Sequence, residues 1–213
     1  MLKKATFDKV FWEMASMPEY TPVGTSIISS NVNSYTLTAK DLNSNYITKY
    51  KTNFNSLFSG LTIFGTDQTA SFIYSKNAKS PINFCLNGDT ALTVLLSSVY
   101  IENVYNTTKL SARQRATKVL TSYLIPQLKV FSNNFTQSEI KYFGFSAVYG
   151  SKDFIDDSSK PKAELVSIVV PQILIKKYAS GSITEDDLVA GSEIWLSDRD
   201  VITDIKKVKI TLE

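Results

Sequence analysis

Histidine is absent from the 213 residues of this chain, and Cys85 is its single cysteine. The absence of histidine excludes Ser-His and Cys-His nucleophile pairs, histidine-ligated metals and the usual proton shuttle near neutral pH. One cysteine forms no disulfide within the chain and no zinc site by itself. We expect Cys85 to be a small buried hydrophobic residue, because no basic residue adjoins it to activate the thiol.

Long hydrophobic runs and glycine-rich loops are also missing. The longest strongly apolar stretches, around Ala91–Leu96 and Leu165–Ile175, are far shorter than the roughly 18 residues of a membrane-spanning helix. Asp8 and Glu13 interrupt the apolar core that an export signal would have. The 8 glycines form neither a G-x-G-x-x-G nor a G-K-S/T signature, which disfavours nucleotide-hydrolysing and dinucleotide-binding classes. We expect a soluble protein, made in the cytoplasm, with no membrane partner.

No charge of one sign dominates. The chain has 23 Lys and Arg residues against 20 Asp and Glu residues, a net charge of +3 that is spread along its length. This balance makes no strong case for binding anionic lipid or nucleic acid, and we expect no sequence-specific nucleic-acid partner. The 213 residues, 43% of them hydrophobic, suffice for one large or two small globular domains.

Apolar residues at helical spacing predict a helix over residues 1–17, which Pro18 and Pro22 end. The helix either packs on the core of its own subunit or forms an arm that docks on a neighbouring subunit. A longer helix, from Leu42 to Leu61 and terminated by Gly60, is predicted in the same way. The apolar stripe of the first helix consists of Phe7, Val10, Phe11, Met14 and Met17.

A pair of helices is predicted over Asp89–Phe131. The first begins at Asp89 as N-cap and continues to about Tyr105, and the second begins with the capping box Ser111-Ala112-Arg113-Gln114. Pro126 is expected to kink or break the second helix. Its first turns carry basic residues that indicate either a solvated face or a contact with an acidic partner or phosphate backbone: Lys109, Arg113, Arg115 and Lys118.

Strands are predicted where β-branched residues or alternating patterns occur. The first such segments are Thr25–Thr38 and a small antiparallel meander of Leu61–Phe64, Ala70–Tyr74 and Ile82–Leu86. Later ones are Ile140–Tyr149 with an irregularity at Gly144, Leu165–Val170 buried on both faces, and the pair Ser192–Ser197 and Val201–Leu212 around the turn Asp198-Arg199-Asp200. Short helices are predicted from Pro171 to Tyr178 and from Thr184 to Gly191, and Gly150–Lys162 is predicted to be an exposed polar loop.

The change from helical to strand periodicity near Asn133 predicts an α+β fold: a helical pair plus mixed or antiparallel β-structure, with a β-rich C-terminal half. The predicted organisation is an N-terminal helical arm (1–22), a mixed α/β region with the helical pair (23–134) and a β-rich region (135–213). The last two regions can form one continuous domain.

Catalytic chemistry without histidine would need carboxylates, lysine or magnesium. The acidic groups Asp156-Asp157, Glu185-Asp186-Asp187 and Asp198 with Asp200 are each explained by a loop, a helix start or a turn. Glu139-Ile140-Lys141 resembles the E-x-K of metal-dependent nucleases, with Asp198 or Asp200 as a further carboxylate. A magnesium-dependent nuclease or phosphodiesterase is therefore an alternative; the leading expectation is a protein that is no enzyme and has no cofactor.

Ser, Thr and Asn make up more than a quarter of the chain, Lys far outnumbers Arg, and Tyr and Phe are abundant. In this texture and layout the chain resembles phage head-tail connector rings and tail hubs, similar in kind to those of the crAss-like Bacteroidales phages. The resemblance implies a structural virion protein, synthesised in the host cytoplasm, that forms a homo-oligomeric ring and contacts portal, ring or tail components. Expected interface residues are Phe7, Val10, Phe11 and Met14 of the arm and Phe154 of the loop. A cytoplasmic bacterial binding module is a further alternative.

Overall fold

The computed structural model describes residues 20–23, 46, 48–60, 70–75, 82–87, 91–96, 99–135, 139–156, 158, 160–197 and 205–212. Several predicted elements lie outside these residues: the helix over 1–17 with its four interface residues, the strands of 25–38, the run Leu61–Phe64 and the turn at 198–200. They stay predictions.

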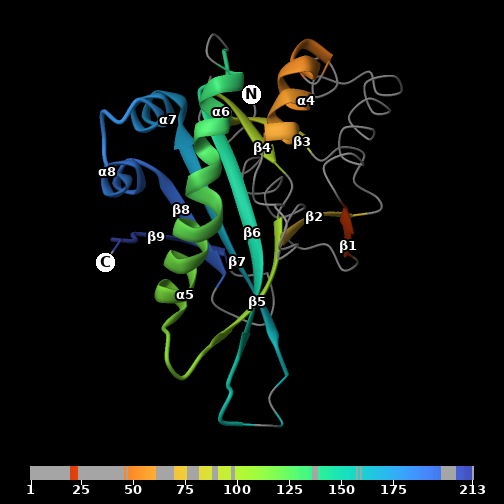
Figure 1. Ribbon diagram of the computed structural model, residues 1–213, viewed down its shortest axis with the longest axis vertical. Helices are drawn as coiled ribbons and strands as arrows, with labels where there is room; N and C mark the ends of the chain where they lie inside the picture. The colour runs from red at the N-terminus through yellow and green to blue at the C-terminus, as the bar shows by residue number, and fades with distance from the viewer. Residues whose placement is uncertain are drawn as a thin grey trace.

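A β–α–β crossover organises the fold. Strand β5 (Val99–Asn106) leads through a helical segment to β6 (Tyr142–Lys152), and the two strands are parallel. Strand β4 (Ala91–Leu96) is also parallel to β6 and pairs with its beginning, so β4 and β5 lie one after the other along the same edge of β6. Parallel neighbours require such a crossover, and here the helix that makes it covers the sheet (Figure 1).

The sheet has nine strands in the order β1-β2-β5-β6-β7-β8-β9, with β3 and β4 joined to it through β6. Apart from the two parallel pairs with β6, all pairs are antiparallel. The remaining strands are β1 (Tyr20–Val23), β2 (Ala70–Ser75), β3 (Ile82–Asn87), β7 (Lys162–Pro171), β8 (Glu193–Ser197) and β9 (Ile205–Val208). The fold is therefore α+β with a mixed sheet, as predicted.

The crossover helix begins and changes form where the sequence predicts. Ser111 caps α5 (Ala112–Val119) through a capping box with Gln114. The helix then widens to a π segment, η2 (Leu120–Leu124), and tightens to a 3-10 turn, η3 (Ile125–Gln127), before α6 (Leu128–Asn134). Pro126 has no N–H for the α-helical ladder, which accounts for the irregular stretch.

Aromatic side chains join the helices to the sheet. The ring of Phe131 on α6 lies 5.1 Å from that of Phe143 and 5.8 Å from that of Phe145, both on β6. The ring of Phe135 lies 5.1 Å from Phe54 on α4 (Lys51–Gly60), the helix that ends at Gly60 as predicted. All five rings are almost fully buried. One hydrophobic cluster thus includes residues on both sides of residue 134. The predicted division of the chain into regions 1–22, 23–134 and 135–213 stays a prediction.

The prediction of a first helix in the pair over Asp89–Phe131 is wrong. The segment from Ala91 to Asn106 forms strands β4 and β5, and its apolar residues are part of the sheet. A short apolar run fits the inner face of a helix and a strand buried on both faces equally well. The residues Thr93, Val94 and Ile101 are β-branched and fully buried, which favours the strand once β6 offers a hydrogen-bonding edge.

Other strand predictions need smaller corrections. Strands β2 and β3 exist, but β2 pairs with β1 and β5 while β3 pairs with β4, so they form no meander with each other. Gly144 causes no irregularity between β6 and β7, whose register is regular along all ten pairs. The only irregularity on β6 lies against β5, where the register shifts between Ile101 and Val104. The loop is shorter than Gly150–Lys162, because Gly150 and Lys162 belong to β6 and β7.

The C-terminal elements follow the predictions. Helix α7 (Gln172–Ala179) begins after Pro171, and α8 (Glu185–Ala190) has Thr184 as N-cap and Gly191 as C-cap. Strands β8 and β9 form the predicted antiparallel pair, but β9 ends at Val208, so residues 209–212 are not part of the strand that was predicted to reach Leu212. Strand β7 is buried from Glu164 to Val170, as expected for a strand covered on both faces. Cys85 lies in β3, the strand in which it was expected.

Candidate functional site

Strands β6 and β7 form a long hairpin that reaches beyond the helices to the loop at the bottom of Figure 1. The carboxylate of Asp153 accepts hydrogen bonds from the N–H groups of Ile155 (2.8 Å) and Asp156 (3.4 Å). Asp156 in turn accepts the N–H (2.9 Å) and hydroxyl (2.6 Å) of Ser158. These Asx turns order the described residues of the loop, here called the tip (residues 153–156 and 158).

The tip presents two large apolar side chains to solvent. Phe154 is 51% exposed and Ile155 is 81% exposed. Because the two residues are adjacent, they give the tip a larger apolar surface than a single exposed residue would, and exposed apolar patches mark interaction sites. The structure thus places Phe154, a predicted interface residue, on an exposed surface, and adds Ile155, which the sequence analysis had not singled out.

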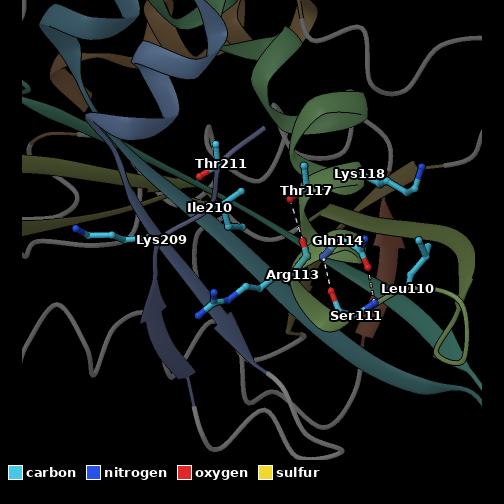
Figure 2. Close-up of a pocket in the computed structure, with 9 residues that line it drawn as sticks. All are labelled: Leu110, Ser111, Arg113, Gln114, Thr117, Lys118, Lys209, Ile210 and Thr211. Atoms are coloured by element: carbon cyan, nitrogen blue, oxygen red, sulfur yellow. Dashed lines mark hydrogen bonds between the residues drawn. The ribbon is translucent and has the colours of Figure 1, made fainter. Parts of the chain in front are cut away.

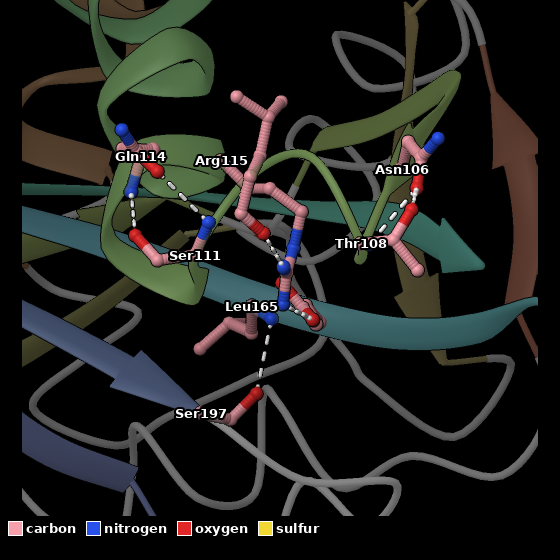
Figure 3. A network of polar contacts seen from close by, with 9 residues as sticks. Asn106, Thr108, Ser111, Gln114, Arg115, Leu165 and Ser197 are labelled. Atoms are coloured by element: carbon pink, nitrogen blue, oxygen red, sulfur yellow. Dashed lines mark hydrogen bonds and ion pairs between the residues drawn. The ribbon is translucent and has the colours of Figure 1, made fainter. Parts of the chain in front are cut away.

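A buried ion pair holds the base of the hairpin. Arg115 of α5 donates from Nε to Glu164 of β7 (3.0 Å) and from Nη2 to the other oxygen of the same carboxylate. Its Nη1 donates to the carbonyl of Leu110 (2.5 Å), so the guanidinium also closes the turn before α5 (Figure 3). Both side chains are less than a tenth exposed. A two-pronged contact of this kind fixes orientation as well as distance.

The turn between β5 and α5 connects this ion pair to the hairpin backbone. The carboxamide oxygen of Asn106 accepts the N–H (2.9 Å) and the hydroxyl (2.6 Å) of Thr108 (Figure 3). The N–H of Thr107 donates to the carbonyl of Lys152 at 2.9 Å, just before the tip. The direction in which the hairpin leaves the body is therefore set by hydrogen bonds at its base.

Tyr149 lies beside the ion pair, and Tyr105 packs against Tyr149. Burial raises the pKa of Tyr149 above its ordinary value, and the negative charge of Glu164 raises it further. Burial also raises the pKa of Tyr105, whose ring meets that of Tyr149 edge-on at 5.6 Å. Both phenols remain neutral at physiological pH, and their rings pack against each other.

The structure corrects the prediction for the four basic residues at the start of this helix. Arg115 belongs to no solvated face, because it is buried against Glu164. Lys109, Arg113 and Lys118 are exposed, as that prediction expected. The signal that separates the two arginines is helical phase: Arg115 lies four residues before the buried Val119, whereas Arg113 lies on the other side of the helix.

A basic pocket of about 650 Å³ lies between α5 and the segment that follows β9 (Figure 2). In Figure 2 the side chain of Arg113 extends from α5 toward the segment that carries Lys209. Leu110 and Ile210 contribute its apolar surface, and Ile210 is 9% exposed. The full lining is Leu110, Ser111, Arg113, Gln114, Thr117, Lys118, Lys209, Ile210 and Thr211.

Among the described residues, the lining of this pocket carries three positive charges and no carboxylate. Within the part of the chain that the structure describes, Arg113, Lys118 and Lys209 take part in no ion pair. The capping box already occupies the Ser111 side chain, so the positive character of the pocket comes from these three side chains. Such a surface attracts an anionic group from solution.

The Glu139-Ile140-Lys141 motif lies just before β6 and outside the strand on which it was predicted. The carboxylate of Glu139 forms an ion pair with Lys49 at 2.5 Å and accepts from the Tyr50 hydroxyl at 3.3 Å. This hydrogen bond with Lys49 lowers the pKa of Glu139 and raises that of Lys49. Asp198 and Asp200, its suggested partners, lie outside the described residues.

Metal-ligating clusters of side chains and membrane-spanning helices are two features that the described residues do not show. Over the described ranges, no group of three or more Asp, Glu or Cys side chains is arranged to hold a metal ion. None of the helices that the structure describes has the length and apolar character of a membrane span.

Comparison with known proteins identifies no family. No protein-family model and no curated protein matches the chain. Among solved structures, the Legionella pneumophila effector protein RavZ aligns with 76% of this chain, and RavZ in complex with human LC3B aligns with 80%. Both alignments have 10% sequence identity and a TM-score of 0.23, and they cover 36% of the RavZ chain. A likeness this low carries no inference about fold or activity.

Proposed function

We propose that this protein is a non-enzymatic structural subunit that assembles with copies of itself into a ring, of the kind found at the head-tail junction or tail hub of a bacteriophage. Its partners in the virion would then be portal, ring or tail components. The observation that carries this proposal is the β6–β7 hairpin, whose shaped tip exposes Phe154 and Ile155.

The tip has the properties of a docking element. Covering its two apolar side chains on a neighbouring subunit would favour association by up to about 1.5–3 kcal/mol for each. The turns made by Asp153 and Asp156 already order the backbone, so little conformational entropy is lost when the tip binds. The buried Arg115–Glu164 pair at the base anchors the hairpin, so that a contact at the tip is transmitted to the body.

Ring formation needs a contact between two different faces of the subunit, because a self-complementary face closes at two copies. A projecting hairpin on one side and a receiving surface elsewhere satisfy that need. The predicted N-terminal arm, with Phe7, Val10, Phe11 and Met14, is a second proposed contact and lies outside the described residues.

The decisive experiment compares purified full-length protein with the variant Phe154→Ser/Ile155→Ser, here called the tip variant. We expect the wild type to form a closed oligomer by light scattering and native mass spectrometry, and the tip variant to stay monomeric with an unchanged melting temperature. Ile173→Ser is the matched control, because Ile173 on α7 is 59% exposed and lies outside the tip. The control should assemble as the wild type does.

Two results would contradict the proposal. A wild type that is monomeric at every concentration tested would remove the basis for a ring. A tip variant that assembles normally would show that the hairpin is no contact. Membership of a virion is tested separately, by detecting the chain among the proteins of purified phage particles by mass spectrometry.

A further inference from the structure

The basic pocket lies between α5 and the segment after β9. Its cations Arg113, Lys118 and Lys209 make no ion pair with any described residue, and the apolar side chains of Leu110 and Ile210, here called the apolar floor, line the same pocket. A partner suited to this surface would combine negative charge with apolar side chains.

The tip of the hairpin has this composition. Asp153-Phe154-Ile155-Asp156-Asp157 contains three acidic and two large apolar residues in succession. Both apolar side chains face solvent, and Asp153 and Asp156 are part of the exposed turn that carries them. Lys152 and Lys160 flank the segment but stand outside this acidic stretch.

We infer that the hairpin tip of one copy docks in the basic pocket of the next copy. The inference rests on the proposed function and names the two surfaces that meet. The carboxylates of the tip approach Arg113, Lys118 and Lys209, while Phe154 and Ile155 cover the apolar floor. A pocket of about 650 Å³ is in the range that accommodates a few side chains of this size.

The contact joins different copies. Within one chain Phe154 and Ile155 are exposed, and neither lines the pocket, so the tip does not fill the pocket of its own subunit. Because tip and pocket are different surfaces, each copy offers one of each, and the contact repeats from copy to copy.

Charge also argues against the simplest alternative, a two-fold contact between two tips. That arrangement would bring Asp153 and Asp156 of one copy against the same residues of the other, and juxtaposed like charges disfavour association. A contact between two pockets would set cations against cations. Only the tip-to-pocket arrangement pairs opposite charges.

The test uses two full-length variants that should each fail to assemble. The first is the tip variant, Phe154→Ser/Ile155→Ser. The second is the pocket variant, Arg113→Glu/Lys118→Glu, which reverses two exposed side chains. Its matched control is Lys141→Glu/Lys177→Glu, which reverses two exposed lysines outside the pocket and should assemble like the wild type.

Mixing the two variants separates this inference from the proposed function. The pocket variant still has an intact tip and the tip variant still has an intact pocket. The tip of the first can therefore bind the pocket of the second, and no further copy can be added. We expect a heterodimer in native mass spectrometry of the mixture, at least tenfold tighter than any self-association of either variant. A variant with all four substitutions should form no dimer with itself or with either of the other two variants.

The outcomes are distinct. A monomeric mixture, with a wild type that assembles and a tip variant that does not, overturns the pocket as the receiver and leaves the proposed ring intact. A monomeric wild type overturns both. If the pocket variant assembles normally but loses binding to a DNA oligonucleotide that the wild type binds, the pocket is a phosphate site and the inference is wrong.

Salt supplies a further criterion. The Debye length shortens from about 30 Å at 0.01 M to about 10 Å at 0.1 M salt, so a contact with paired charges should weaken as salt rises. We expect the dissociation constant of the heterodimer to rise at least threefold over this range. A constant that does not change would contradict the pairing of the carboxylates with Arg113 and Lys118.

Discussion

The two ends of the β6–β7 hairpin have opposite surroundings. At the base every residue of β7 from Glu164 to Val170 is buried under helices and neighbouring strands, and Glu164 is neutralised by Arg115. At the tip the described residues from Phe154 to Ser158 are exposed, and the carboxylates of Asp153 and Asp156 accept hydrogen bonds from nearby backbone N–H groups and from the Ser158 hydroxyl. The same pair of strands therefore stabilises the fold at one end and presents a surface at the other.

The contrast predicts how substitutions divide. Changes at the base should lower the free energy of unfolding, whereas changes at the tip should alter association alone. Each prediction below tests one part of this division, beginning with the largest effect.

Arg115→Met should lower the free energy of unfolding by about 3–5 kcal/mol, because it leaves the Glu164 carboxylate buried without its partner. Chemical denaturation measures the change. The double variant Arg115→Met/Glu164→Leu should recover most of the loss, since two apolar side chains need no neutralisation. Arg113→Met, on the exposed side of the same helix, is the control. A loss below about 1 kcal/mol for Arg115→Met would show that water reaches the pair.

Gly150→Ala should cost about 1–3 kcal/mol through overpacking. A Cβ at position 150 would lie 2.9 Å from Cγ2 of Val104, at the register shift between β5 and β6. Valine is stiff about its first side-chain torsion and does not rotate away easily. The double variant Gly150→Ala/Val104→Ala removes that methyl group and should restore most of the stability, as read from thermal unfolding. If the double variant is no more stable than Gly150→Ala, the clash with Val104 is not the cause of the lost stability.

Stability should fall as pH rises above about 10, at up to about 1.4 kcal/mol per pH unit for one buried tyrosine. The folded-state pKa of Tyr149 is raised above its unfolded value, so its contribution is fully present below pH 10 and is lost as the pH rises further. Denaturation midpoints between pH 8 and pH 11 would measure the slope. Tyr149→Phe should reduce it, and Tyr105, whose pKa is also raised, should account for part of the remainder. An unchanged slope would contradict this assignment.

Ser111→Ala should lower stability by about 1 kcal/mol, because it removes the side-chain acceptor of the Gln114 N–H at the start of α5. Ser122→Ala, at an exposed position later in the crossover helix, is the matched control and should change little. Urea unfolding resolves the difference. Equal effects of the two substitutions would mean that the capping box contributes nothing.

The tip variant should have the smallest effect on the monomer, within about 0.5 kcal/mol of wild type, because its two substituted side chains are exposed. Unfolding below the concentration at which the wild type assembles isolates the monomer. A larger loss would show that the tip packs on its own subunit, and the contrast between the two ends of the hairpin would then fail.

Local signals in the sequence predicted many of the element ends. The capping box Ser111–Gln114, the irregular stretch at Pro126 and the N-cap Thr184 are all where the residues place them. These features depend on groups within four residues of each other, whose hydrogen bonds follow from short-range geometry. Such features were predictable because no distant segment takes part in them.

Long-range features were predicted poorly. The run from Ala91 to Asn106 has helical spacing, yet it forms β4 and β5 because β6, some forty residues later, provides a parallel edge. The sequence analysis grouped Arg113 and Arg115 together on one basic helix start. The fold distinguishes them, because Glu164 of β7 lies opposite Arg115. The basic pocket combines α5 with residues 209–211, almost a hundred positions away, and no sequence motif predicts it.

The amino-acid sequence thus determines the composition of the molecule, the absence of histidine chemistry, the caps and breaks of its helices and the exposed polar loop that contains Phe154. The folded chain decides which apolar run is strand, which charge is buried and which cations share a pocket. The reason is that local hydrogen bonds and steric limits act over a few residues. Burial and charge pairing instead depend on partners that only the packed sheet and helices bring together.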